Sequence, residues 1–291
     1  MSVRIVRYHA LMGSPTVGRW QLAHELRRLR GDETRDSAAK AIGVAPSSIT
    51  RWEDPAGMTP RARDLKLLLG HYGVGEDETT RVLNLRSQAR TPGWWQEYGI
   101  AKEYGTYIGL EAEATRIENY ESALVPGLLQ TEDYTRAVVQ AAVPGISEEE
   151  LASQVHVRTV RQDRWREQLP ETWFFINEAV IHQQVGGPYV MTEQLKRLLA
   201  LPGNGSVTLQ LLPYEAGAHA GLPQPPFSLL HLREVAAVCT ESYNGTLLLD
   251  KPSDIDRHVR LLNHLRAAAA SPQQTRITIE RALRTLEGLS K

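Results

Sequence analysis

The segment 46–53, Pro-Ser-Ser-Ile-Thr-Arg-Trp-Glu, gathers side chains that suit the recognition of a nucleic acid. Ser47, Ser48 and Thr50 carry hydroxyl groups, which both donate and accept hydrogen bonds. Arg51 adds a planar guanidinium that only donates. Groups of this kind match the base edges and phosphates of a DNA major groove. They are poor material for a protein core, because a buried polar group needs a partner. These four residues are therefore candidate DNA contacts.

A short helix from Pro46 to about Trp52 would turn these polar side chains outward. Proline suits the first helical position, where its missing N–H costs nothing. Ile49 and Trp52 recur at helical spacing and would face a core. The polar side chains then remain on the opposite face of the helix, where they are free to enter a groove.

A second helix is predicted directly before this one, over residues 35–42. Thr34 is placed to cap it, since a hydroxyl at that position accepts from the free N–H groups of the first turn. Small residues at Ala38 and Ala39 let another helix approach closely. Gly43 ends the helix where a left-handed backbone is commonly needed. Helix, glycine turn and second helix form a helix-turn-helix unit.

Three further segments, 18–30, 60–72 and 77–90, also carry apolar residues at helical spacing. The sequence thus predicts a mostly α N-terminal bundle of five helices. Its role stays open at this point. Helix-turn-helix units bind DNA, but they also occur as plain structural pieces of helical bundles.

The run 34–53 resembles the phage-repressor-like (XRE-type) helix-turn-helix family of bacterial regulators. It carries the small residue Ala38, the Gly43-Val44 turn and the ending Ser-Ile-Thr-Arg-Trp-Glu. Three later segments, 90–96, 107–116 and 124–134, are similar to an antitoxin-like group of actinobacterial regulators. In that group the DNA-binding domain precedes a large C-terminal domain of unassigned function.

The resemblance implies base or phosphate contacts at the four polar positions of the recognition helix. It also implies a phosphate contact at Arg35, which begins the preceding helix. Two positions depart from the family pattern: Ala45 replaces the usual hydroxyl cap, and Pro46 replaces a glutamine. Because glutamine can read adenine and proline cannot, we expect a different operator preference from that of typical relatives.

Composition is that of an ordinary globular chain with room for two domains: 291 residues, 42% hydrophobic and 23% charged. Cys239 is the single cysteine, so no internal disulfide can form. No apolar stretch is long enough to span a bilayer, and residues 1–18 lack the apolar core of a secretory signal. These features predict a cytoplasmic protein without membrane contact.

Charge is distributed unevenly, although the whole chain carries a net charge of only −1. Residues 1–91 hold 15 lysines and arginines against 10 acidic residues, a balance of +5. The remainder holds 18 against 24, a balance of −6. A mildly basic N-terminal module on an acidic body is compatible with DNA contact.

The body is predicted to be α+β, with a small, mainly antiparallel sheet. Strands are expected over residues 173–176, 207–212, 227–232, 236–240 and 246–249, and helices over 108–118, 132–142, 148–167, 192–201, 253–268 and 272–286. The proposed domains are an N-terminal arm (1–17), the helix-turn-helix domain (18–91), a helical linker region (92–170) and an α+β dimerisation or signal-receiving domain (171–291). Trp94 and Trp95 would pack the linker against its neighbours.

No enzyme motif is found, so we expect no catalytic activity, no cofactor and no metal. Cys239 lies on a predicted strand, where we expect it to be a small buried residue rather than a nucleophile. His219 lies on a glycine- and proline-rich loop, 217–226, that could cover a pocket or be a plain surface loop.

The sequence therefore predicts a sequence-specific transcriptional regulator that binds double-stranded DNA as a homodimer on a near-palindromic operator. Its body would receive a signal from either a small partner protein or a small-molecule effector. The alternative is an enzyme or small-molecule-binding protein that uses the α+β domain, with the helical bundle as an interaction module.

Overall fold

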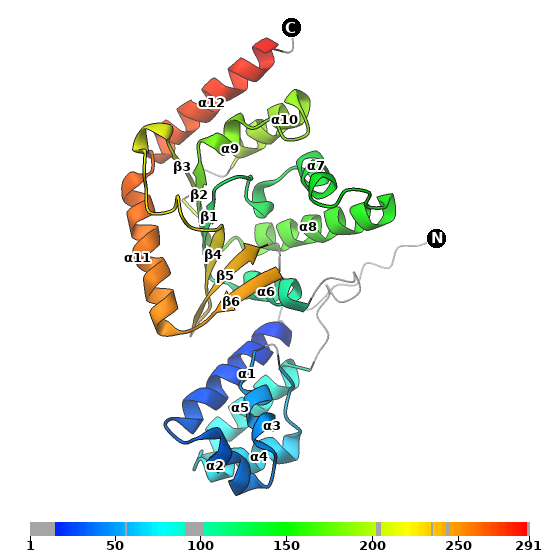
Figure 1. Cartoon of the computed structure of the whole chain (residues 1–291), viewed down its shortest axis with the longest axis vertical. Helices are drawn as coiled ribbons and strands as arrows, with labels where there is room; N and C mark the ends of the chain where they lie inside the picture. The colour runs from blue at the N-terminus through cyan, green and yellow to red at the C-terminus, as the bar shows by residue number, and fades with distance from the viewer. Residues whose placement is uncertain are drawn as a thin grey trace. The chain divides into compact units, whose positions relative to one another are not determined.

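The computed structural model describes residues 15–55, 57–90, 102–201, 205–233, 235–242 and 245–289 (Figure 1). The chain divides into two compact units, residues 1–113 and 114–291. The described part of the first unit is helical, whereas the second contains a sheet with helices on both faces. Trp94 and Trp95 lie outside the described residues.

Six helices are described in the first unit, rather than the five of the predicted bundle. They are α1 (Pro15–Arg30), α2 (Arg35–Ile42), α3 (Pro46–Trp52), α4 (Ala62–His71), α5 (Glu76–Gln88) and α6 (Lys102–Glu113). The bounds of α2 and α3 are those predicted, while α1 begins at Pro15, inside the proposed N-terminal arm. The additional helix, α6, was expected further along the chain, over residues 108–118.

Local capping explains the bounds of α2 and α3. Thr34 Oγ1 accepts the N–H of Ser37 at 3.2 Å, which confirms the predicted cap. Gly43 has φ 71° and ψ 35°, the left-handed conformation expected for it. Ala45 provides no side-chain cap for α3, as its replacement of a hydroxyl residue predicted. The buried core beneath these helices consists of Leu22, Leu26, Ala38, Ala39, Ile49, Trp52, Leu65, Leu68, Leu69 and Val82.

The second unit is built on a mixed six-stranded sheet in the order β3-β2-β1-β4-β5-β6. Its strands are β1 (Arg116–Glu121), β2 (Glu171–Asn177), β3 (Val207–Leu212), β4 (Phe227–His231), β5 (Ala236–Ser242) and β6 (Gly245–Leu249). Strands β1, β2 and β3 run parallel, and β4, β5 and β6 continue the sheet antiparallel. The prediction of a mainly antiparallel sheet is therefore wrong.

The error arose at β1, the central strand, whose first residues were assigned to a helix. Its sequence, Arg-Ile-Glu-Asn-Tyr-Glu, does not look like a buried strand, yet Glu118 and Asn119 are both buried. Glu118 pairs with His231 on β4 at 2.9 Å, and Asn119 Nδ2 donates to Ser228 Oγ at 3.0 Å. These partners lie more than 100 positions away in the sequence, so no local pattern could reveal them.

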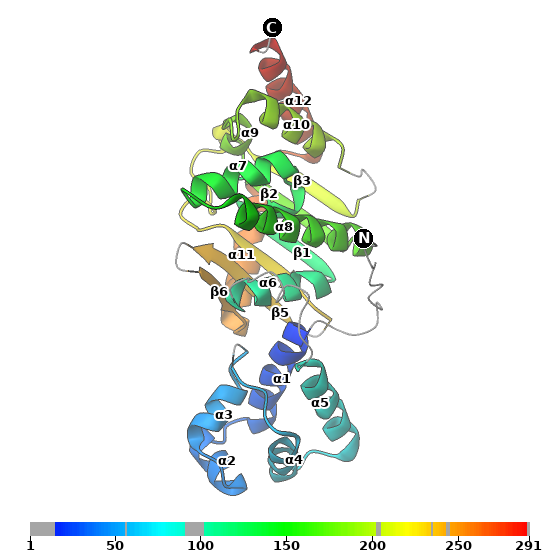
Figure 2. The same cartoon turned by 90° about the vertical axis from the view of Figure 1, so that its right-hand side faces the viewer.

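Helices cover both faces of the sheet. They are α7 (Glu132–Ala142), α8 (Glu148–Gln168), α9 (Ala179–His182), α10 (Pro188–Leu199), α11 (Pro252–Ala268) and α12 (Pro272–Leu289). Figure 2 shows α7 and α8 in front of the strands and α11 behind them. Segments containing α7 and α8, then α9 and α10, connect the three parallel strands, as parallel pairing requires a long crossover.

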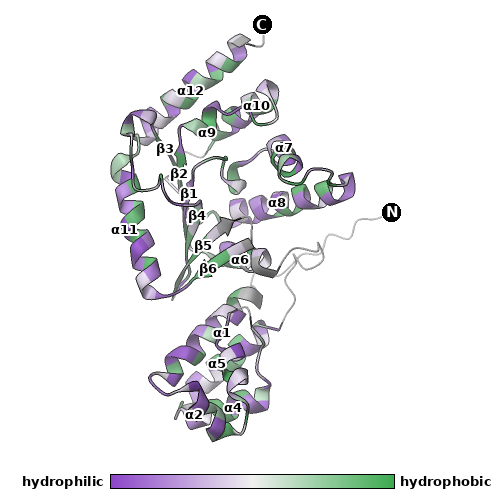
Figure 3. Cartoon of the chain, in the orientation of Figure 1, coloured by the Kyte–Doolittle hydropathy of each residue, from purple (hydrophilic) through white to green (hydrophobic). Residues whose placement is uncertain are grey.

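The motif at 124–134 is held by a buried polar network. Gln130 Nε2 donates to the Val125 carbonyl at 2.7 Å, and Gln130 Oε1 accepts from Arg158 at 2.7 Å. Gln162 Nε2 reaches the Gln130 carbonyl at 2.9 Å. In Figure 3, α8 is hydrophilic over much of its length, and part of its polar surface thus binds this loop rather than water. Arg158 of α8 thus has a structural role.

Candidate nucleic-acid interface

The outward face of α3 carries the polar side chains that the sequence analysis names as candidate DNA contacts. Ser47, Thr50 and Arg51 are exposed, and Ser48 is half-buried. Ile49 and Trp52 are buried on the opposite face. The predicted division of this helix into a core side and a polar side is confirmed.

Arg51 lies back along its own helix. Its Nε donates to the Ser47 carbonyl at 3.1 Å, and its Nη2 lies 3.4 Å from Ser47 Oγ. Thr50 Oγ1 donates to the Pro46 carbonyl at 3.3 Å. Within the described residues Arg51 has no carboxylate partner, so no ion pair neutralises its positive charge. Its guanidinium can therefore turn to a phosphate or a guanine without breaking an ion pair.

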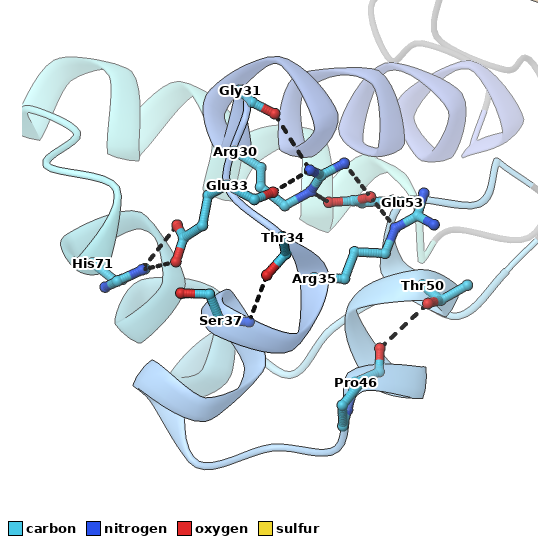
Figure 4. A network of polar contacts seen from close by, with 10 residues as sticks. All are labelled: Arg30, Gly31, Glu33, Thr34, Arg35, Ser37, Pro46, Thr50, Glu53 and His71. Atoms are coloured by element: carbon cyan, nitrogen blue, oxygen red, sulfur yellow. Dashed lines mark hydrogen bonds and ion pairs between the residues drawn. The ribbon is translucent and has the colours of Figure 1, made fainter.

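A buried carboxylate joins three helices beside this face (Figure 4). Glu53 follows α3 and is only 3% exposed. Arg30, at the end of α1, donates to it through Nε at 2.6 Å and through Nη2 at 3.1 Å. Arg35, at the start of α2, donates through Nε at 2.8 Å. Since α1, α2 and α3 all meet at one carboxylate, Glu53 fixes the position of the recognition helix.

Arg35 stands where the resemblance implied a phosphate contact. Its side chain is 45% exposed, and its Nε is bound to Glu53. Within the described residues its two Nη groups have no acceptor, so they can still donate outward. The ion pair therefore orients Arg35 without consuming all of its donors.

The other end of α3 is held by Arg19, which is 7% exposed. Its guanidinium donates to the carbonyls of Trp52 at 3.0 Å, Arg51 at 2.8 Å and Gly57 at 3.2 Å, and also to the carbonyl of Asp54. Free carbonyls at a helix C-terminus attract positive charge. One arginine of α1 thus caps the recognition helix and orders the loop after it.

Burial lowers the pKa of Arg19 to about 10, and the nearby charge of Asp54 partly opposes that shift. The side chain accordingly stays protonated at neutral pH and keeps its full set of donors.

Sequence reasoning missed Arg19, Arg30 and Glu53 as determinants of the interface. Glu53 was noticed only as the end of a family motif. Arg19 stands beside Trp20 in a helix with an apolar face, and nothing in its spacing points to the carbonyls of residues more than 30 positions away. The signal would have been a charged residue at a position that the helix turns inward.

The histidines of the second unit do not assemble into one site. His231 pairs with Glu118 at 2.9 Å, and His182 lies 3.5 Å from Glu178. Burial lowers the pKa of His219, whose Nδ1 accepts the Gly221 N–H at 3.3 Å. In the described parts of the chain, no group of three or more His, Cys, Asp or Glu side chains could hold a metal ion.

The loop that carries His219 is anchored to the sheet. A Cβ on Gly221 would lie 2.8 Å from Tyr120 Cζ and 2.9 Å from Leu265 Cδ2, so a larger residue there would force these side chains to shift. Cys239 is buried on β5. Helices in the described residues are all too short or too polar to cross a membrane.

Comparison with protein families gives two matches. A model described as a helix-turn-helix domain matches residues 21–82, which contain α2 and α3. A model described as a domain of unknown function (DUF5753) matches residues 104–281, from α6 into α12. No curated protein and no solved structure matches the chain.

Proposed function

The chain belongs to the DUF5753 family, and because it also carries a helix-turn-helix domain, we propose that it is a sequence-specific DNA-binding transcriptional regulator. The observation that carries the proposal is the outward face of α3, with Ser47, Thr50 and Arg51 exposed above a firmly held helix. Ser48 stands half-buried at its border, and Arg35 lies at the start of α2. In our proposal these five residues contact DNA.

The regulator reads its operator as a homodimer. One seven-residue recognition helix reaches few base pairs, and each good bidentate contact discriminates by only about 1–3 kcal/mol. Two half-sites about one helical turn apart double the contacts. The operator should therefore be near-palindromic.

We place the protein in the cytoplasm, among phage-repressor-like regulators of the antitoxin-like actinobacterial group. In this proposal the second unit acts as a receiver, and its signal is either a small partner protein or a small-molecule effector. Purification from the native cell separates the two, since a stoichiometric small protein indicates docking and a retained metabolite indicates sensing. Either species must favour one dimer geometry to alter DNA affinity.

The alternative from another class is an enzyme whose helical bundle serves as an interaction module. Mapping the genomic DNA that the protein occupies in cells decides between the two. A discrete palindromic motif supports regulation. Uniform, salt-labile occupancy contradicts it, because phosphate contacts alone carry no sequence information.

Replacing Arg51 by alanine should weaken operator binding by about 1–3 kcal/mol, with a smaller change on unrelated DNA, because the guanidinium is expected to read bases. Fluorescence anisotropy on the mapped operator measures it. Arg257→Ala is the matched control, since it removes a charge that is also exposed, from α11. Unchanged operator affinity in Arg51→Ala would remove this residue from the interface.

Replacing Arg35 by alanine should lower affinity for all DNA sequences alike. The slope of log affinity against log salt concentration should flatten by about 1, because one phosphate contact is lost. Glu53 retains Arg30 as a partner, so the fold should survive. A salt slope equal to that of the unmodified protein would show that Arg35 touches no phosphate.

A further inference from the structure

The two edges of the sheet are treated differently by the rest of the fold. At the β3 edge, the N–H of Leu211 donates to Thr275 Oγ1 of α12 at 3.0 Å, and the carbonyl of Leu211 accepts from the N–H of Ala270 at 2.8 Å. Helix α12 also packs along β3. These contacts satisfy outward backbone groups, which would otherwise attract another strand.

Strand β6 forms the opposite edge and pairs with β5 alone. Among the described residues, nothing bonds to the outward backbone groups of Gly245–Leu249. The strand contains no charge and no proline, the features that normally protect an edge. Leu247 is 56% exposed, and β6 is hydrophobic in Figure 3. An open, apolar edge strand is a template for strand addition.

The chemistry of β6 suits a second copy of itself. Strands β4 to β6 already alternate in direction, so an antiparallel addition continues their pattern. About a two-fold axis at Leu247, the sequence Gly-Thr-Leu-Leu-Leu places Leu247 opposite Leu247, and Thr246 opposite Leu248. No two like charges face each other in this register.

The side chain of Leu247 also lies on the apolar face of the sheet, the one covered by α11. Leu247 pairs with Thr240, and Thr240 pairs with Phe227, so all three lie on the face that packs against α11. Leu249, two residues on, already packs against that core together with Ile255 and Val259. Pairing of two β6 strands would therefore join two apolar cores across the axis.

We propose that β6 is the dimerisation strand: two copies pair β6 with β6 in antiparallel register centred on Leu247 and form one continuous sheet. The inference rests on the proposed two-fold recognition of DNA and names the surface that produces it. A five-residue strand pair is smaller than a standard interface of about 1,200–2,000 Å². The free dimer is consequently weak, and binding to two half-sites reinforces it.

Cysteine cross-linking tests both the surface and the register. In the proposed register two Leu247→Cys side chains face each other with Cβ atoms about 4.5–5.5 Å apart, close enough for a disulfide after slight adjustment. The native Cys239 is 2% exposed and should not react. Oxidation with copper–phenanthroline should give a covalent dimer of Leu247→Cys far faster than of Thr246→Cys or of Leu222→Cys, whose loop position is 60% exposed.

Cross-linking of Leu247→Cys no faster than these two controls would overturn the proposal. A second measurement does not depend on disulfide geometry. Sedimentation velocity over a concentration series should show a monomer–dimer equilibrium for the unmodified protein and for Leu222→Lys, and only monomer for Leu247→Lys. Equal dimerisation of Leu247→Lys, or a monomeric unmodified protein at every concentration, contradicts the proposal. Far-UV circular dichroism confirms that the variants are folded.

Failure of this inference and failure of the proposed function are distinguishable. If the unmodified protein binds a palindromic operator with two copies but Leu247→Cys does not cross-link, β6 is the wrong surface and the regulator stands. If Leu247→Cys cross-links but no operator exists, β6 is the dimerisation strand and the regulator proposal fails.

Discussion

Replacing Glu53 by alanine is expected to lower the free energy of unfolding of the N-terminal unit by about 3 kcal/mol. Removing one member of a buried ion cluster leaves the others without compensation, and such losses reach about 3–5 kcal/mol. We take the lower value because the Arg30 and Arg35 side chains, 16% and 45% exposed, recover some hydration. The change is large against a domain stability of about 5–15 kcal/mol.

Hydrogen exchange of the intact chain measures this loss where it occurs. Amides of α2 and α3 should lose protection by roughly a hundredfold, the equivalent of about 3 kcal/mol. Glu33→Ala is the matched control, because it also removes a carboxylate from this network, but one that is 26% exposed and contacts His71 at 2.9 Å. If both variants lost protection equally, the three-helix junction at Glu53 would have no special role.

Replacing Arg19 by methionine is expected to lower the free energy of unfolding of the N-terminal unit by about 3 kcal/mol. Methionine fills similar space but donates no hydrogen bond, so the carbonyls of Arg51, Trp52 and Gly57 lose this donor. The Asp54 carbonyl also loses Arg19 but keeps the N–H of Gly57 at 2.8 Å. A buried acceptor without a partner costs about 1–3 kcal/mol, and water can reach only some of these. Exchange at residues 51–55 should accelerate first, and operator affinity should fall because the end of α3 is released.

The control for this variant is Arg28→Met on the same helix. Arg28 pairs with Glu25 and Glu78, but its side chain is 51% exposed. An exposed pair of this kind contributes less than about 1 kcal/mol. Comparable destabilisation by both variants would mean that the capping of α3 by Arg19 is unimportant.

Glu53 and Arg19 together explain how a short helix can present a fixed surface to DNA. A seven-residue helix is not stable by itself in water. Here Glu53 ties its end to α1 and α2, and Arg19 caps the carbonyls beyond it. The polar face of α3 is thus held in place before DNA arrives, which reduces the ordering cost of binding.

Local rules were sufficient for the part of the site that faces outward. The Thr34 cap, the left-handed Gly43 and proline at the start of α3 each depend on neighbours within a few positions. The same is true of the alternation that buries Ile49 and exposes Arg51. These features, and with them the candidate contacts, could be predicted from the sequence.

The sheet could be predicted only in part. Strands β2 to β6 were anticipated because their apolar residues alternate or run together. The polar strand β1 was missed, and with it the parallel half of the sheet. The sequence gives no sign that Glu118 will meet His231, because that contact forms only when the strands are already side by side.

What the sequence alone determined about this protein is where most of its helices lie and which face of α3 is polar. Those choices depend on backbone preferences and on spacing along one helix. Tertiary structure alone decided that Arg19, Arg30 and Glu53 hold α3, and that β6 is left as an open edge among the residues described. The physical reason is that a charge or a strand edge is satisfied by whatever the fold brings near it, often from far along the chain.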